Sequence, residues 1–233
     1  RPIAKLKVLS DFNIEVETDL MFWSTHTVLH LVDACIRWSA AIIIPSRVTQ
    51  DILNGITHVW LRLYGPMKRL TSDKEGALDS EIGSAWADRW GIQLNLRPRG
   101  SHARIVERHN ALLRDAVHKI NSQMERDGIA VPPQAILDEA LLAKNSMISI
   151  HGTTPYKALY GRAPALLRDF EPGSETPLSD GQDGIDGMSR HVHRLREVAM
   201  SAIIQGTATD RLSRAMNSRT RPAGELLDLK IGD

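Results

Sequence analysis

Three acidic residues from distant parts of the chain, Asp19, Asp73 and Glu107, could act together. Three carboxylates that converge without a counter-charge repel one another, and a divalent cation removes that repulsion. Their hard oxygen atoms suit Mg²⁺ or Mn²⁺. Two such ions can activate an attacking oxygen and stabilise the leaving oxygen of a phosphodiester. Because the sequence contains 28 acidic residues, residue type alone does not single out this trio, and the elements that carry the three residues decide whether they meet.

Asp19 lies in a stretch whose side chains alternate in polarity. Over residues 13–22 the apolar side chains share one face and the acidic side chains share the other: Ile14, Val16, Leu20 and Phe22 against Glu15, Glu17 and Asp19. This period of two predicts a half-buried strand with Asp19 on its charged face. Two further stretches rich in Val and Ile, 27–34 and 38–44, follow at short intervals. The three together favour an antiparallel meander.

Helical and extended patterns then alternate as far as Glu107. They first predict a helix from an N-cap at Thr49 to a stop at Gly65, and then a strand over 67–71 that runs into Asp73. A helix over 78–90, closed by Gly91, and a strand over 92–96 follow. Two further helices are predicted over 105–126 and 133–146. This order predicts the α/β class, with a five-stranded mixed sheet flanked by helices. If the first and fourth strands are neighbours, Asp19 and Asp73 lie side by side, and a helix across the sheet can bring Glu107 over them.

A change in composition near residue 171 indicates the domain organisation. Residues 171–187 are rich in Gly, Pro, Ser and Asp, which is typical of an exposed linker. We therefore predict a folded core over 10–167, a linker over 168–187 and a helical extension over 188–233.

The overall composition excludes several classes of protein. The 29 basic and 28 acidic residues nearly cancel, so any basic surface must be local. The single cysteine, Cys35, excludes an internal disulfide and a multi-cysteine zinc or iron–sulfur site. The longest apolar stretch, 40–44, is far shorter than the ~20 residues that cross a bilayer, so we expect no membrane partner.

A local excess of positive charge surrounds Glu107. Residues 97–119 contain six basic and two acidic residues. Asn110 and Arg114 follow Glu107 by three and seven positions, so they share its side of a helix. A phosphate backbone drawn to that side would pass over the glutamate. The residues that we expect to bind DNA are Arg99, Arg104, Arg108, Asn110, Arg114 and Lys119. A solvated basic helix with no ligand is the alternative.

A series of short motifs resembles a known family. In chain order these are Val16–Leu20, Leu29–Asp33, Trp60–Pro66, Ser72–Asp73, Val106–Asn110, Ala143–Asn145 and Gly152–Pro164. Their order resembles the integrase catalytic core of retroviruses and long-terminal-repeat retrotransposons, gypsy-like or copia-like, over roughly residues 10–167.

The resemblance implies a ribonuclease-H-like fold in which Asp19, Asp73 and Glu107 are the catalytic triad that binds Mg²⁺ or Mn²⁺. It implies metal-dependent 3′-end processing and strand transfer of element DNA into target DNA, by a homo-oligomer that acts inside the cell, in the nucleus. It also leads us to expect a zinc-binding domain upstream and a small barrel after the helical extension.

Two other functions remain open. Lys74 and Glu75 stand where the family usually has Asn-Gly, so a catalytically inactive, DNA-binding relic is one alternative. A ribonuclease-H-type nuclease on the same fold is the other, and the motif over 152–164 argues against it.

Overall fold

A computed structural model describes residues 11–73, 77–97, 104–150, 152–164, 166 and 185–217 of the chain. It contains a five-stranded sheet in the order β3-β2-β1-β4-β5. The strands are β1 (Glu15–Trp23), β2 (His26–Asp33), β3 (Ser39–Ile44), β4 (Arg69–Asp73) and β5 (Gln93–Arg97). β1, β2 and β3 pair antiparallel, whereas β4 pairs parallel to β1 and β5 pairs parallel to β4. The predicted mixed sheet, its meander and the contact between the first and fourth strands are confirmed.

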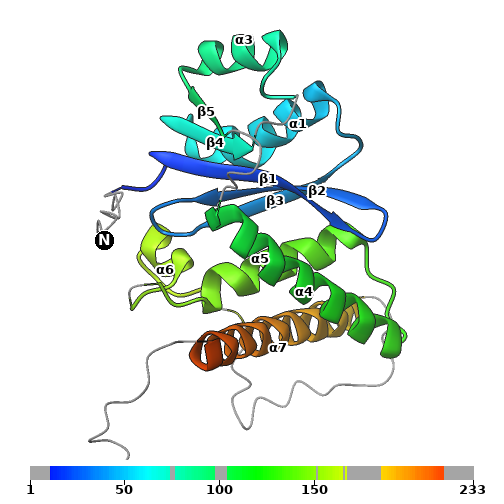
Figure 1. Cartoon of the computed structure of the whole chain (residues 1–233). Coiled ribbons are helices and arrows are strands. Elements are labelled where there is room, and N and C mark those ends of the chain that lie inside the picture. The colour runs from blue at the N-terminus through cyan, green and yellow to red at the C-terminus, as the bar shows by residue number, and fades with distance from the viewer. Residues whose placement is uncertain are drawn as a thin grey trace, which may run out of the picture.

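Helices cover both faces of the sheet (Figure 1). On one side lie α4 (Arg104–Arg126), α5 (Pro133–Met147) and α7 (Ile185–Asn217), and on the other lie α1 (Thr49–Ile56) and α3 (Glu81–Trp90). The short elements are a π-helix η1 (Thr57–Leu61), α2 (Arg62–Tyr64) and α6 (Pro155–Tyr160). This arrangement of a five-stranded mixed sheet between helices is the ribonuclease-H-like fold that the sequence predicts.

Each face of the sheet has its own apolar core. Met21, Trp23 and Val28 pack with α4, α5 and α7, whereas Val16 and Leu29 pack with α1 and η1 on the other face. The approach of α1 to β2 is close, since a Cβ added at Gly55 would lie 2.7 Å from Leu29 Cδ2. Because β1 and β2 are buried on both faces, these two strands form the centre of the fold.

The region predicted as one regular helix from Thr49 to Gly65 differs in two details. The N-cap is Val48, and Thr49 is already helical, so the predicted cap is wrong. The Ser46 hydroxyl accepts the Val48 N–H and bonds the Asp51 carboxylate instead. The π-helical turn then adds residues to the helix, so Leu63 turns out to solvent, although the 3.6-residue period places it on the buried side. Gly65 ends the region with a positive φ of 74°, as predicted.

The C-terminal helical region is present as α7, which packs against α4 and α5 and contributes Ala199 and Ile203 to their core. The approach is close at Gly206, where a Cβ would lie 2.8 Å from Leu112 Cδ1. Residues 167–184, which include most of the predicted linker, lie outside the described residues, so the domain boundaries stay a prediction. Within the described part of the chain, no helix is both long and apolar enough to span a membrane.

Candidate active site

The α4 side of the sheet is polar over β4 and β5. The pairing register places six polar side chains on this side of the two strands: Arg69, Thr71, Asp73, Gln93, Asn95 and Arg97. The opposite side of the same strands carries Leu70 and Leu94, which belong to the α1 core. Since polar side chains that face one side of a sheet are costly to cover with an apolar helix, this half of the face is suited to a site.

Asp19 and Asp73 occupy adjacent positions at the boundary of that polar area. Thr18 and Ser72 are direct partners in the parallel β1–β4 pair, and an aspartate follows each of them. Both aspartates are partly exposed and both lie on the α4 side of the sheet. The predicted pairing of the first and fourth strands, which would bring these two residues side by side, is confirmed.

Helix α4 carries Glu107 one turn before the residue that contacts Asp19. Asn110, one helical turn after Glu107, donates a hydrogen bond of 2.7 Å from Nδ2 to Asp19 Oδ2. Asn110 is buried against the sheet, whereas Glu107 is exposed. Asp19 and Asp73 therefore lie at neighbouring positions of β1 and β4, and Glu107 lies on the turn of α4 that leads to the contact with Asp19. As the side chains stand, no three His, Cys, Asp or Glu groups among the described residues form a set that could hold a metal ion.

Asp19 is oriented by a chain of buried hydrogen bonds. Its Oδ1 accepts the Leu20 N–H at 2.8 Å, and its Oδ2 accepts Asn110 Nδ2. Asn110 Oδ1 lies 2.6 Å from His30 Nδ1. Burial, assisted by the charge of Lys144, lowers the pKa of His30 to about 3, so the ring is neutral. Because the Asn110 amide nitrogen is committed to a carboxylate, His30 must donate from Nδ1, and its tautomer is fixed.

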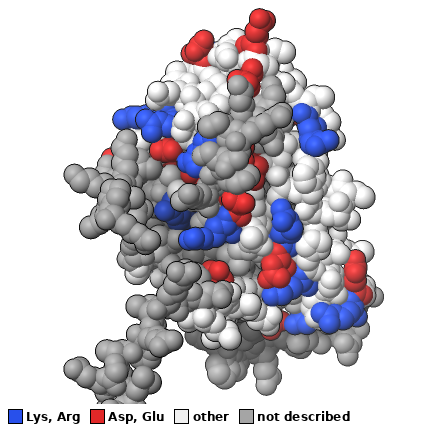
Figure 2. Space-filling model, in the orientation of Figure 1, with Lys and Arg blue, Asp and Glu red and all other residues white. Residues whose placement is uncertain are grey.

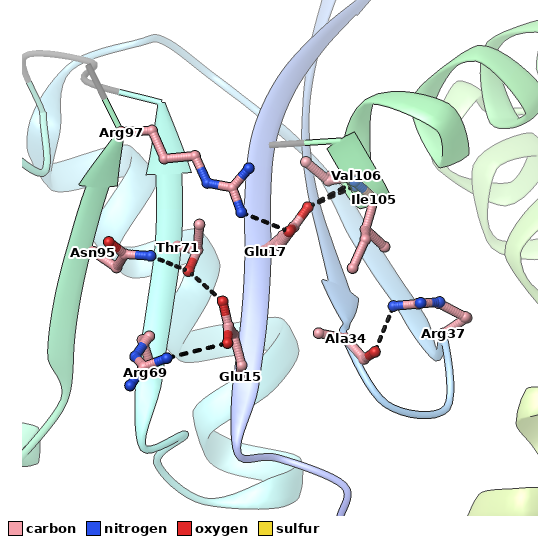
Figure 3. A network of polar contacts seen from close by, with 10 residues as sticks. All are labelled: Glu15, Glu17, Ala34, Arg37, Arg69, Thr71, Asn95, Arg97, Ile105 and Val106. Carbon is pink, nitrogen blue, oxygen red and sulfur yellow. Dashed lines mark hydrogen bonds and ion pairs between the residues drawn. The ribbon is translucent and has the colours of Figure 1, made fainter. Parts of the chain in front are cut away.

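A buried acid, Glu17, lies two residues before Asp19 on the same side of β1 (Figure 3). Glu17 Oε2 accepts the backbone N–H groups of Ile105 at 2.9 Å and Val106 at 3.0 Å, in the first turn of α4. Its Oε1 accepts Arg97 Nη2 at 3.2 Å. The sequence predicts a charged outer face here, and for Glu17, which is only 2% exposed, that expectation is wrong because α4 covers it.

The signal for a covered face was present in the sequence. The residues that continue the acidic side of β1 beyond Asp19 are Met21 and Trp23, both buried and apolar. A side that changes from acidic to apolar along one strand must pass beneath a covering element. Glu15, the first residue of β1, instead bonds Thr71 Oγ1 at 2.9 Å and Arg69 at 3.3 Å, both on the neighbouring strand β4 (Figure 3).

A third buried polar group lies behind the site, on the β2–β3 side. Lys144 of α5 is fully buried and donates to Ser39 Oγ, and Asn145 bonds both backbone groups of Ser39. Burial lowers the pKa of Lys144 to about 7. Burial, with the charge of Lys144 as a second cause, also lowers the pKa of His109 well below its usual value. These groups fix α5 to β3 through polar contacts inside an otherwise apolar region.

The predicted DNA-binding residues divide into three groups. Arg108 and Arg114 are exposed on α4, and Lys119 is half-exposed and paired with Asp115 at 2.8 Å. Asn110 is buried and bonded to Asp19 and His30, so its amide faces the protein. Arg99 and the side chain of Arg104 lie outside the described residues. Figure 2 shows basic and acidic side chains interspersed over this face, without one continuous basic area.

Solved structures give the same architecture. No protein-family model matches this chain. The catalytic core domain of BIV integrase matches with a TM-score of 0.53 and 19% identity, over 63% of this chain and 93% of its own length. The HTLV-2 integrase catalytic core domain, solved in complex with magnesium, matches with a TM-score of 0.52 and 14% identity, over 62% of this chain and 95% of its own. The fold is that of a retroviral integrase catalytic core.

A chain from the simian T-cell lymphotropic virus intasome, solved in complex with PP2A regulatory subunit B56 gamma, also matches. Its TM-score is 0.60 and its identity 15%, over 73% of this chain and 63% of its own length. The integrase-core fold predicted from the motifs is therefore confirmed by structures whose sequences share fewer than one residue in five with this chain.

Proposed function

We propose that this chain is the catalytic core of a retrotransposon-type integrase that trims the 3′ ends of element DNA and joins them to target DNA. The observation that carries the proposal is the placement of Asp19 and Asp73 at adjacent positions of β1 and β4, with α4 bonded to Asp19 one turn beyond Glu107. The integrase-core fold supports it, since two of the similar solved structures are integrase catalytic cores.

The residues present suit a divalent metal. Asp19, Asp73 and Glu107 offer only hard carboxylate oxygens, which Mg²⁺ and Mn²⁺ prefer. The Leu20 N–H and Asn110 Nδ2 occupy two of about four lone-pair positions of the Asp19 carboxylate. The Asn110 bond would orient this carboxylate as a metal ligand. When bound, Mg²⁺ or Mn²⁺ would supply charge stabilisation and activation for displacement at phosphorus.

The chain's own residues would perform the rest of the work. The His30–Asn110 pair holds the Asp19 carboxylate in one orientation, so little reorganisation is needed when substrate binds. Arg108 and Arg114, exposed near Glu107 on α4, would hold the phosphate backbone of double-stranded DNA across the site. Because two DNA ends must be joined in concert, we propose that the protein acts as a homo-oligomer. We also propose that it acts in the nucleus.

The test is strand transfer with Mg²⁺ by the Asp73→Asn variant, compared with Asp88→Asn. Asp88 is exposed on α3, on the other side of the sheet, and undergoes the same chemical change. We expect joining to be lost only in Asp73→Asn, and equal joining by the two variants would remove Asp73 from the mechanism. DNA binding by the unmodified protein without metal-dependent cleavage or joining would favour the inactive relic. A preference for an RNA–DNA hybrid over duplex DNA would favour the nuclease.

A further inference from the structure

We infer that Glu17 is a positioning residue that fixes the first turn of α4 on β1 and thereby sets Glu107 relative to Asp19. The inference rests on the proposed function, since it concerns the geometry of the proposed active site. Glu17 itself lies behind the site, buried beneath α4, and acts through the backbone of that helix.

The contact replaces an ordinary helix cap. The first four N–H groups of a helix have no partner within the helix and are usually satisfied by a nearby side chain. Here Ile105 and Val106 donate to a single carboxylate oxygen that is 88 and 89 residues away in the sequence. The positive end of the helix dipole favours a negative group at this position, and bonds to an ionised acceptor are stronger than neutral ones. The cap therefore attaches the helix to a particular strand position.

The same carboxylate also holds the end of β5. Glu17 Oε1 accepts Arg97 Nη2 at 3.2 Å, so one buried side chain contacts the chain on both sides of residues 98–103. Val106 is fully buried against Val32, which adds an apolar contact at the same turn. These contacts place the start of α4, the end of β5 and the middle of β1 in one fixed relation (Figure 3).

Glu107 lies between two attachments of α4 to β1. The first joins Glu17 to Val106, one residue before Glu107, and the second joins Asp19 to Asn110, three residues after it. Glu17 and Asp19 are two positions apart on the same side of one strand. Glu107 therefore cannot shift along or away from β1 without breaking a charge-assisted hydrogen bond. Loss of the first attachment would leave the first turn of α4 held to the sheet by the Val106–Val32 contact and by Asn110, so this turn could tilt at Glu107.

Glu17→Gln removes the charge and offers an amide where Arg97 now donates. Variants of the groups that orient metal ligands typically lose 10- to 100-fold in metal affinity or activity. We expect the Mg²⁺ concentration for half-maximal strand transfer to rise about tenfold, with faster amide hydrogen exchange at Ile105 and Val106. The matched control is Glu15→Gln, which loses the same charge on the same side of β1 but whose carboxylate bonds Thr71 and Arg69 of β4. It should leave both readings unchanged.

Each other outcome has a definite meaning. Faster exchange at Ile105 and Val106 with an unchanged Mg²⁺ requirement would overturn the positioning role and leave only a stabilising cap. Unchanged exchange would overturn the contact itself. Glu17→Asp keeps the charge but shortens the side chain, so we expect the same defects as in Glu17→Gln. Wild-type behaviour of Glu17→Asp would show that the charge matters and the length of the side chain does not. Failure of the proposed function is seen separately, as full activity of Asp73→Asn, while the exchange measurement still tests the contact.

Discussion

The two halves of the α4 side of the sheet differ in what their side chains do. Over β2 and β3 the side chains that face the helices are mostly apolar, such as Val28 and Ala41, and α5 and α7 complete the core above them. Over β4 and β5 every side chain on the same side is polar, and four of them, Arg69, Thr71, Asn95 and Arg97, bond to one another or to β1. β1 is the boundary strand, with Glu17 and Asp19 on the polar side of the boundary and Met21 on the apolar side.

This difference separates stability from chemistry. Burial of apolar area stabilises the β2–β3 half by about 25 cal/mol per Å², and it holds the strand and helix that carry Asp19 and Glu107. The β4–β5 half gains little from burial and instead orients polar groups, as active sites do when they rest on a rigid scaffold. Substitutions in the apolar core of one half should therefore change mainly stability, and substitutions of the proposed metal ligands at the border of the other half should change mainly activity.

The largest effect is expected for Asp19→Asn. The substitution removes the charge of a proposed metal ligand and keeps its shape, so strand transfer with Mg²⁺ should fall by on the order of 10³-fold, or about 4 kcal/mol in activation free energy. The melting temperature should stay within a few degrees, because the amide can still bond its neighbours. A variant that unfolds at a much lower temperature would show that Asp19 mainly stabilises the fold, which would contradict the proposed difference between the two halves of the sheet.

The opposite pattern is expected for Leu137→Ala in α5. Leu137 is fully buried in the core beneath β2 and β3, and large-to-small changes at such positions cost about 2–5 kcal/mol. Denaturant unfolding should show this loss. Strand transfer per folded molecule, measured well below the melting temperature, should remain within about twofold of wild type. An activity loss as large as that of Asp19→Asn would contradict the division between the halves.

The sequence predicts most of the fold, whereas the roles of the site residues stay a prediction. β1 and α4 follow from periodicity because each buries a defined face. Asn110 shows the limit, since three positions along a helix turn a side chain about 60° away from Glu107, enough to pass from solvent to the sheet. The sequence predicts an outer face for Glu17 because a period of two does not reveal which element lies above that face of the strand. Tertiary packing decides both cases.

A third prediction concerns Lys144, a charged group in the apolar half. Its pKa is about 7 in the folded protein and 10.5 when exposed. Between these values the unfolded chain binds a proton that the folded chain lacks, so stability rises with pH, by at most about 1.4 kcal/mol per pH unit. The free energy of unfolding should therefore increase from pH 7 to pH 9. Lys144→Met should flatten this rise, while Lys157→Met, at an exposed position in α6, should retain it.

The smallest effect is expected for Arg108→Ala, next to Glu107. Arg108 is exposed on α4, and one phosphate contact contributes about 1 kcal/mol, so duplex binding should weaken only a few-fold, equally for all sequences. The slope of log affinity against log salt should decrease by about 0.9, since one fewer counterion is released. Arg194→Ala is the control, because Arg194 is half-exposed on α7 and paired with Asp127 and Glu197. Equal salt slopes for the two variants would show that Arg108 does not contact DNA. The DNA would then not cross the polar half of the sheet beside Glu107.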